Sequence, residues 1–300
     1  MTYKTILVHL DETPHVAARV LMAAELALQH EAHVIGVALT GVSRFLYQNE
    51  MVDEQDPNLA RHLDVLRERA ARALAGFAPQ LRALGVHSFE ERLLDDEPGA
   101  GLALLGRHAD LVIVGQALPE QHGAAGFPAE VLTESGCAVL VVPHTARPLS
   151  SISVSTAGVA TQGAPAPGHD VLVAWNASKE AARAMREALP LLRRADKITV
   201  AILDADLHPV LFGDPPGADL LAWLARHGVT AQVTLATSPR QGLLKRPSQV
   251  GESLLALAAE RGCDMMVLGA FGHSRFRETL LGGVTRTVLD AMTVPVLMAH

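Results

Sequence analysis

Residues 4–12 read KTILVHLDE, and residues 170–177 read DVLVAWNA. Each stretch is a run of apolar and β-branched residues that ends in an Asx residue, Asp11 in the first and Asn176 in the second. Such runs are typical of β-strands that are covered on both faces of a sheet. The recurrence of one pattern later in the chain predicts that the protein is built from two related halves.

An amphipathic helix is predicted after each of these strands, because apolar residues recur there at helical spacing. They are Ala17, Val20, Leu21, Ala24 and Leu28 in the first half, and Ala182, Met185, Leu189 and Leu192 in the second. We expect Thr13 to be the N-cap of the first helix, with Pro14 as its first residue, and Ser178 to precede the second.

Four further pairs of apolar segments match between the halves. ADLVIVG (109–115) parallels CDMMVLG (263–269), and CAVLVVPH (137–144) parallels TVPVLMAH (293–300). HVIGVAL (33–39) parallels ITVAILD (198–204), and SFEERLL (88–94) parallels VTAQVTLA (229–236). Strands that alternate with helices predict an α/β fold, here two tandem doubly wound, mostly parallel five-stranded sheets with helices on both faces.

The chain of 300 residues is long enough for two domains, each with its own core. Residues 145–169 are rich in Ser, Ala, Gly, Thr and Pro and show no periodicity, which is typical of a linker. We therefore expect one domain at 1–144, a linker at 145–169 and a second domain at 170–300.

The composition restricts the class of protein. With 49% hydrophobic and 19% charged residues the chain is typical of a compact globular protein. Its net charge of −7 argues against broad binding to nucleic acid or to an anionic membrane. No signal peptide or membrane-spanning run is visible, and two cysteines far apart in sequence indicate neither a disulfide framework nor a zinc site. We expect a cytoplasmic protein.

The segment most capable of chemistry follows the fourth strand of the second half and reads GAFGHSRFRETLLGGVT (269–285). In a parallel α/β sheet, ligands bind beyond the carboxyl ends of the strands. Glycines let backbone N–H groups approach a ligand, and a Gly-Gly step before the predicted helix 284–292 would form an anion cradle, with His273, Ser274 and Thr285 as side-chain donors. The alternative is that these glycines serve only a helix cap and close packing.

The spacing G-x2-G-x9-G-G-V-T, followed by a helix and a VPVLM strand, resembles the nucleotide loop of the universal stress protein family, and the resemblance extends over both halves. It implies a Rossmann-like fold of the adenine nucleotide alpha-hydrolase type and binding of ATP or a related adenine nucleotide, with or without Mg²⁺. Carried over by position, Asn176 would lie at the ribose, and the backbone of Ile202 would meet the adenine. The loop residues implied in binding are Gly269, Gly272, His273, Gly282, Gly283, Val284 and Thr285.

This sequence departs from the family pattern at two of those positions. Gly283 stands where the pattern prefers Ser or Thr, which removes one hydroxyl donor. Asn176 stands where the pattern has Asp, so its hydrogen bond to a ribose hydroxyl would lack the help of a charge. Both changes predict weaker nucleotide binding.

The first half keeps the acid, Asp11, but its loop differs, reading GQALPEQHGAAGFP (115–128). Leu118 replaces the second glycine of the pattern, and Phe127-Pro128 replace its Gly-[ST] step. Proline lacks a backbone N–H, and Glu120 adds negative charge near any phosphate. We therefore predict that the first half does not bind ATP in the manner of the family, and that Asp11 caps the turn before Pro14.

These observations favour a stress-response regulatory protein that binds an adenine nucleotide in its C-terminal domain without fast catalysis. A nucleotide-independent interaction or dimerisation module of the same family is the alternative. Slow ATP hydrolysis or autophosphorylation, with Ser274 or Thr285 as acceptor, is a third hypothesis, although no catalytic base is identified. Asp204, Asp206 and His208 are interpreted as solvated loop residues rather than a metal site. The fifth strands of the two halves are predicted to pair as an intramolecular pseudo-dimer, with a further homodimer left open.

Overall fold

The computed structural model describes residues 2–46, 57–117, 127–145, 167–207, 209–239, 247–271 and 282–300. Over these residues the chain is an alternation of strands and helices that repeats once, as the sequence predicts. Each repeat contributes five strands. The α/β class and the five strands per repeat are therefore confirmed.

The first repeat has the following elements: β1 (Thr5–Leu10), α1 (Val16–His30), β2 (His33–Leu39), α2 (Pro57–Leu74), α3 (Phe77–Ala83), β3 (Phe89–Leu94), α4 (Pro98–Gly106), β4 (Leu111–Gly115), α5 (Phe127–Glu134) and β5 (Ala138–Val142). In the second repeat, β6 (Asp170–Ala174), α6 (Lys179–Leu192) and β7 (Lys197–Leu203) come first. A 3-10 turn, η4 (Ala205–Leu207), α7 (Pro209–Phe212), α8 (Ala218–Arg226), β8 (Gln232–Ala236), α9 (Pro247–Arg261), β9 (Met265–Gly269), α10 (Gly283–Ala291) and β10 (Val296–Ala299) follow.

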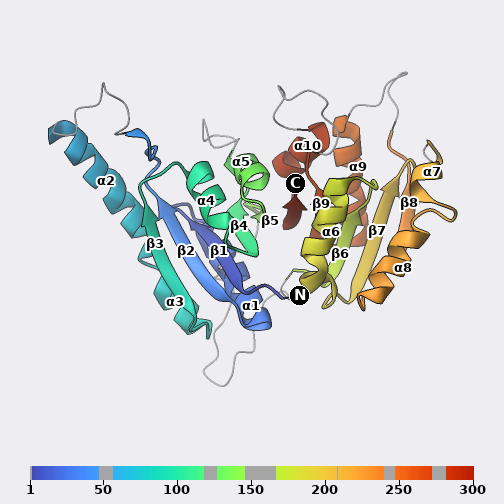
Figure 1. Ribbon diagram of the computed structural model, residues 1–300, viewed down its shortest axis with the longest axis horizontal. Helices are drawn as coiled ribbons and strands as arrows, with labels where there is room; N and C mark the ends of the chain where they lie inside the picture. Colours follow the sequence, from blue (N-terminus) through green and yellow to red (C-terminus); the bar gives the residue numbers. More distant parts are fainter. Residues whose placement is uncertain are drawn as a thin grey trace. The chain divides into compact units, whose positions relative to one another are not determined.

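The described residues divide into two compact units. Residues 2–137 form one unit, in which parallel strands lie in the order β3-β2-β1-β4 (Figure 1). The other unit contains the second repeat, where β8, β7, β6, β9 and β10 are parallel neighbours in that order. In both units the first strand of the repeat has the second strand on one side and the fourth on the other.

The fifth strand of the first repeat, β5, belongs by its contacts to the unit of the second repeat. It pairs antiparallel with β10, with Leu140 opposite Leu297 and Val141 opposite Val296. Both strands are fully buried over these residues. The predicted pairing of the two fifth strands is therefore confirmed.

The central strands supply much of each core. Val112, Ile113 and Val114 of β4 are completely buried, as are Met266 of β9 and Leu172 of β6. Strands that are apolar at successive positions can be buried only if helices cover both faces of the sheet. The α/β layering thus follows from the composition of the strands.

Helix α1 begins later than the sequence predicts. Its first residue is Val16 and its N-cap is His15, so Thr13 and Pro14 lie before it. Thr13 is instead held in a turn, because its N–H and its hydroxyl both donate to Asp11 Oδ1, at 2.9 and 2.5 Å. The predicted role of Asp11 in this turn is confirmed. Leu28, assigned from its spacing to the buried face, is half exposed.

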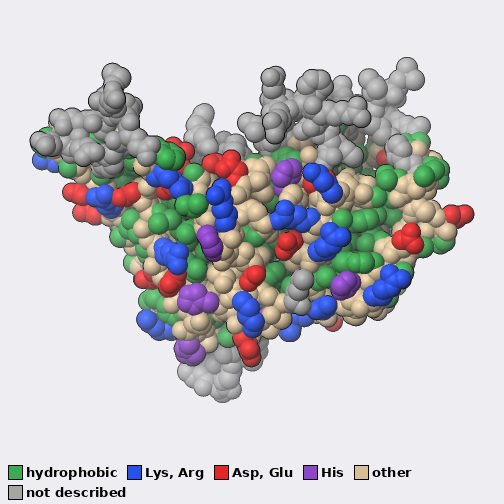
Figure 2. Space-filling view, viewed as in Figure 1, with side chains coloured by type: hydrophobic (Ala, Val, Ile, Leu, Met, Phe, Trp, Pro, Cys, Tyr) green, Lys and Arg blue, Asp and Glu red, His purple; other side chains and the backbone are tan. Residues whose placement is uncertain are grey.

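No helix in the described part of the chain is both long enough and apolar enough to cross a membrane. On the face drawn in Figure 2, Lys and Arg side chains are interspersed with Asp and Glu side chains. Mixed charge of this kind is typical of a hydrated protein surface.

Gly36 in β2 leaves room for the ring of Phe77, the first residue of α3. A Cβ at Gly36 would lie 2.6 Å from Phe77 Cε1, and the ring is buried with its edge toward Phe89 at a centroid distance of 6.0 Å. The Gly36→Ala variant should therefore lose about 1–3 kcal/mol of unfolding free energy, because the ring cannot move aside without disturbing the core.

Urea unfolding of Gly36→Ala and of Gly76→Ala checks this expectation. A Cβ at Gly76 would have only Gln80 Nε2 nearby, at 3.5 Å, so this control should change stability by less than about 1 kcal/mol. Equal stability of the two variants would contradict the packing described for Phe77.

Candidate functional site

The order of the strands fixes where a ligand could bind. In each repeat the second and third strands lie on one side of the first strand, and the fourth strand lies on its other side. The order of strands therefore reverses between β1 and β4 in one unit and between β6 and β9 in the other. The loops that leave these two strands diverge to opposite faces, and ligands of parallel α/β proteins bind in the resulting crevice. The candidate site is therefore the carboxyl end of β6 and β9, and the matching end of β1 and β4 serves for comparison.

Gly269, the last residue of β9, lies against the beginning of α6. A Cβ at this position would overlap the backbone carbon of Glu180 and the backbone nitrogen of Ala181. Only glycine allows this close approach. Gly269 therefore holds the N-terminus of α6 at the end of β9, whether or not it also meets a ligand.

The N-terminus of α10 lies at the same place. Gly282 is its N-cap residue, without a side-chain cap, and Gly283 is its first helical residue. Thr285 is buried, and its Oγ1 accepts a hydrogen bond from Phe271 N, 3.3 Å away and two residues beyond the end of β9. This bond ties the first turn of α10 to the end of β9.

A third helix, α9, begins beside α10. A Cβ at Gly283 would lie 2.7 Å from Pro247 Cβ and 3.5 Å from Ser248 N, in the first turn of α9. This contact explains why glycine occupies the position where the family pattern has Ser or Thr. The N-termini of α6, α9 and α10 thus gather near one strand end (Figure 1), and the positive ends of helix dipoles favour an anion there.

Two further residues assigned by position lie in this unit. Asn176 is exposed just after β6, and its Oδ1 accepts a hydrogen bond from Ser178 N at 3.1 Å. Val284 lies in the first turn of α10, next to Gly283. The structure thus brings Gly269, Gly282, Gly283, Val284 and Thr285 together, and places Asn176 at the end of the adjacent strand.

Ile202, assigned to the adenine, is buried in β7 opposite Leu235 of β8. Trp175 N donates to Ala201 O, and Asp204 N donates to Ala236 O. Since successive residues of a strand turn their backbone groups to opposite sides, those of Ile202 face β8. The backbone N–H and C=O of the next residue, Leu203, face the side of β6, which has already ended at Ala174. The role of Ile202 stays a prediction, with Leu203 as the neighbour whose backbone faces the crevice.

Gly272 and His273, also assigned to the nucleotide, lie outside the described residues, as do Ser274, His208, Leu118 and Glu120. The part of the site described above therefore consists of the two ends of the loop that connects β9 to α10. Among the described residues, no group of three His, Cys, Asp or Glu side chains has the geometry of a metal site.

The first repeat fills the corresponding place with its own side chains. Arg19 of α1 is almost fully buried, and its Nη2 lies 2.7 Å from Asp11 Oδ1. Its Nε donates to His9 O at 3.0 Å. A Cβ on Gly115, at the end of β4, would lie 2.5 Å from Arg19 Nη1. The guanidinium group therefore occupies the crevice between the ends of β1 and β4.

Burial and charge set the protonation of this group of residues. Burial alone would raise the pKa of Asp11, but the charge of Arg19, with smaller contributions from His9 and Thr13, holds that pKa below its usual value. Burial and then Arg19 lower the pKa of His9 to about 4. His9 is therefore neutral near neutral pH, and its ring packs against Phe127 at a centroid distance of 4.8 Å.

An internal carboxylate lies at the N-terminus of α4. A Cβ on Gly99 would overlap the carboxylate of Glu130, which comes from the first turn of α5. Burial, then Glu134, Glu97 and Asp96, raise the pKa of Glu130. The helix end that could attract an anion thus already has one, and further carboxylates lie around it.

A comparison of the two repeats, with β1 placed on β6 and β5 on β10, shows what differs. The large or acidic residues of the first repeat correspond to small or basic ones in the second. The pairs are His9 and Ala174, Arg19 and Ala184, Phe127 and Gly283, and Glu130 and Arg286. The side chains that fill the first crevice are therefore missing from the second. Sequence reasoning missed these residues, although aligning the repeats position by position could have found them.

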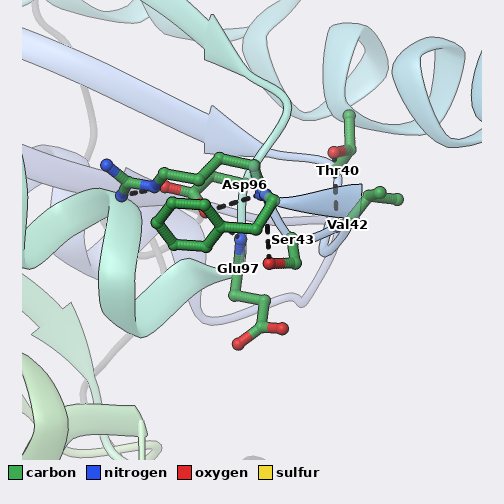
Figure 3. A network of polar contacts seen from close by, with 7 residues as sticks. Thr40, Val42, Ser43, Asp96 and Glu97 are labelled. Carbon is green, nitrogen blue, oxygen red and sulfur yellow. Dashed lines mark hydrogen bonds and ion pairs between the residues drawn. The ribbon is translucent and has the colours of Figure 1, made fainter. Parts of the chain in front are cut away.

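A buried carboxylate also lies at the ends of the second and third strands of each repeat, and Figure 3 shows the one in the first repeat, Asp96. In the first repeat Asp96, after β3, accepts hydrogen bonds from the backbone N of Glu97 at 2.9 Å and of Arg44 at 3.4 Å, and pairs with the Arg44 guanidinium. In the second repeat the acid, Asp204, follows β7, and it accepts from Ser238 N and Oγ at 3.1 and 2.7 Å. Asp204 is thus a structural residue of this turn.

The pair formed by Asp11 and Arg19 should contribute strongly to stability. Asp11→Asn leaves the Arg19 guanidinium buried without an opposing charge, and should cost about 2–4 kcal/mol of unfolding free energy at neutral pH. Because the folded state lowers the pKa of Asp11, its contribution is present above about pH 4 and is lost as the pH falls further. Urea unfolding at neutral pH and near pH 3 measures both effects.

Two variants make this measurement specific. Adding Arg19→Met to Asp11→Asn should restore much of the loss, since no buried charge then remains. Glu12→Gln, which removes an exposed carboxylate bonded to Arg69 and Arg72, should cost much less stability than Asp11→Asn, because solvent screens surface ion pairs. An Asp11→Asn variant as stable as Glu12→Gln would show that the ion pair does not support the fold.

Comparison with known proteins agrees with this fold. Residues 169–300 match the sequence model of the universal stress protein family. The whole chain is similar to a universal stress protein from Archaeoglobus fulgidus DSM 4304, with a TM-score of 0.65, 15% identity, and 98% of this chain and 95% of that chain covered. It is also similar to a functionally unknown protein from Pseudomonas aeruginosa PAO1, with a TM-score of 0.57, 14% identity and coverage of 99% and 92%.

A further solved structure, a universal stress protein in complex with cAMP, covers 47% of this chain and 98% of its own length, at 23% identity and a TM-score of 0.36. Among proteins of curated function, none is significantly similar in sequence to this chain. The family match on residues 169–300 carries the assignment, and the full-length similarities show the same fold in both repeats. Residues 169–300 therefore match the universal stress protein family, and the whole chain has the fold of a two-repeat universal stress protein.

Proposed function

We propose that the second repeat binds an adenine nucleotide of the ATP type, and that the protein is a stress-response regulator without fast catalysis. One observation carries the proposal: the N-termini of α6, α9 and α10 gather at the carboxyl end of β9, around Gly269 and Gly283. Backbone N–H groups at helix N-termini are suited to phosphate oxygens. Small residues, Ala174 and Ala184, replace the side chains that fill the first crevice.

The other parts of a nucleotide would meet the neighbouring strands. Asn176, at the end of β6, would offer its amide to a ribose hydroxyl, and backbone groups at the end of β7 would meet the base. A divalent ion, where present, would be held mainly by the phosphates, since the described residues offer no metal cluster of their own. A relative of the same family was solved with cAMP, which also contains adenine.

Two contacts predict modest affinity. Asn176 Oδ1 already accepts a hydrogen bond from Ser178 N, which leaves one lone pair of that oxygen and the NH₂ group for the ribose. The carboxylate of Glu180, in the first turn of α6, is buried and has Lys179 Nζ at 3.5 Å. Its negative charge opposes part of the attraction that the helix ends exert on phosphate.

The described residues offer little support for phosphoryl transfer. Thr285 is 2% exposed, and its Oγ1 is engaged with Phe271 N, so it is a poor phosphate acceptor. A regulatory role, in which occupancy of the site is read by a partner, fits these contacts better than turnover does. Cys137 and Cys263 are buried as thiols, and we propose a reducing compartment such as the cytoplasm.

A nucleotide-independent interaction module is the second candidate. Apolar side chains are exposed around α7 of the second unit, where Val210 is 99% exposed and Leu207 and Leu211 are about half exposed. Exposed apolar side chains that cluster on a monomer often mark a protein contact. Light scattering of the wild type and of Val210→Asp would detect self-association through this surface.

Calorimetric titration with ATP and with AMP tests the proposed site. Wild-type protein should bind one nucleotide per chain, and Gly282→Val should bind at least about tenfold more weakly, because its side chain would cover N–H groups at the start of α10. A Cβ at Gly282 has Phe271 Cα at 3.8 Å, an ordinary contact, so this variant is expected to fold. Asn176→Ala should bind several-fold more weakly than wild type.

Gly126→Val, at the corresponding position before α5, is the matched control and should bind like the wild type. The absence of heat, together with the absence of nucleotide in small-molecule mass spectra of the purified protein, would contradict the proposal. If the protein binds no nucleotide and forms a dimer that the Val210→Asp substitution dissociates, the interaction module is favoured.

A further inference from the structure

The first unit contains a cavity that no part of the proposed nucleotide site uses. Its volume is about 230 Å³, and it lies between the end of β1, the first turns of α1 and the junction of α2 with α3. The residues that line it include Leu10, Glu12, Val16, Val20, Arg72 and Phe77. All of the lining residues belong to the described part of the chain.

The floor of the cavity is apolar and rigid. Leu10, Val20 and Phe77 are each at most 2% exposed. The Phe77 ring is fixed between Gly36, which leaves space for it, and Phe89, which meets it edge-on. An enclosed apolar cavity of about 150 Å³ takes up benzene, so this cavity, which is open to solvent on one side, has room for a ring with a small substituent.

Paired charges surround the mouth of the cavity, and Arg72 is the basic residue among those that line it. Arg69 and Arg72, one turn apart on α2, both donate through Nε to Glu12, at 3.1 and 2.9 Å. Two guanidinium groups thus share one carboxylate. The Nη groups of Arg72 have no partner among the described residues. Asp11, which also lines the cavity, is paired with Arg19. Arg19 and Arg69 lie outside the lining, and when they are counted the five charged groups carry one excess positive charge.

We propose that this cavity binds a small carboxylic acid with a flat apolar body, such as an aromatic monocarboxylate. The body would lie against Val16, Val20 and Phe77, and the carboxylate would bond to the free Nη groups of Arg72. Guanidinium and carboxylate form strong, geometrically matched hydrogen bonds. A whole nucleoside triphosphate is too large for this volume. The cavity also lies in the first repeat, where Arg19 fills the crevice between β1 and β4.

Ligand-observed and protein-observed NMR with benzoate as the probe tests the proposal on the full-length protein. Benzoate should bind saturably and show nuclear Overhauser effects from its ring protons to methyl groups of Val16 and Val20. Benzamide, which has the same shape without the charge, should bind at least several-fold more weakly. These results do not depend on nucleotide binding, because the nucleotide site belongs to the other repeat.

Two variants separate the charge from the cavity. Arg72→Gln should weaken benzoate binding about threefold to tenfold, since it removes the charged donor from an exposed rim. Ala73→Leu extends a half-buried lining side chain into the cavity and should abolish binding. Arg67→Gln is the matched control: Arg67 lies on the same helix, bonds to Asp95 and does not line the cavity, so binding should not change.

Circular dichroism shows whether each variant is folded. The proposal is overturned if folded wild-type protein shows no saturable binding of benzoate, or if benzamide binds equally well. It is also overturned if Arg72→Gln and Arg67→Gln bind benzoate alike, because the carboxylate would then not be recognised by Arg72.

Discussion

Helix N-termini carry unpaired N–H groups, and in a parallel α/β sheet they collect at the carboxyl ends of the strands. These groups need an acceptor. The first repeat places carboxylates of its own close to these ends: Asp11 lies in the turn before α1, where it accepts from Thr13 N, and the carboxylate of Glu130 lies beside Gly99 at the start of α4. In the second repeat Ser178 caps α6, whereas α10 begins at Gly282 without a side-chain cap. The start of α10 is therefore the helix end at which an external anion can act as the acceptor.

Charge balance explains why the two repeats differ at several positions together. An internal carboxylate at Asp11 needs a counter-charge, and Arg19 can provide it only because Gly115 leaves room for the guanidinium. In the second repeat Asn176 has no charge to balance, and Ala184 stands where Arg19 would be. Loss of the acid and loss of the arginine are thus one change, so Asn176 is no isolated defect of a nucleotide site.

The strands, the repeat and the paired fifth strands could be predicted from sequence because they depend on local apolar patterns such as ILV at 6–8 and VLVV at 139–142. The start of α1 could not, because a further turn, closed by Val16 N donating to Thr13 O, lies between the Asp11 turn and the helix, and propensity does not reveal it. Arg19 escaped prediction because an ion pair with Asp11 buries it, whereas a charged side chain is ordinarily assigned to the solvent face of a helix. The reason for glycine at position 283 could not be predicted either, because the residue that leaves no room for a Cβ is Pro247, which is far away in the sequence.

The central claim is that the crevice of the first repeat is filled and the crevice of the second repeat is open. Native mass spectrometry of the full-length protein with ATP tests this claim most directly. The account predicts that bound protein carries a single nucleotide per chain at saturation, and that Gly282→Val removes it. Two nucleotides per chain would show that Arg19 and Phe127 do not close the first crevice. A single nucleotide that survives Gly282→Val would place it outside the second, and either result would contradict the account.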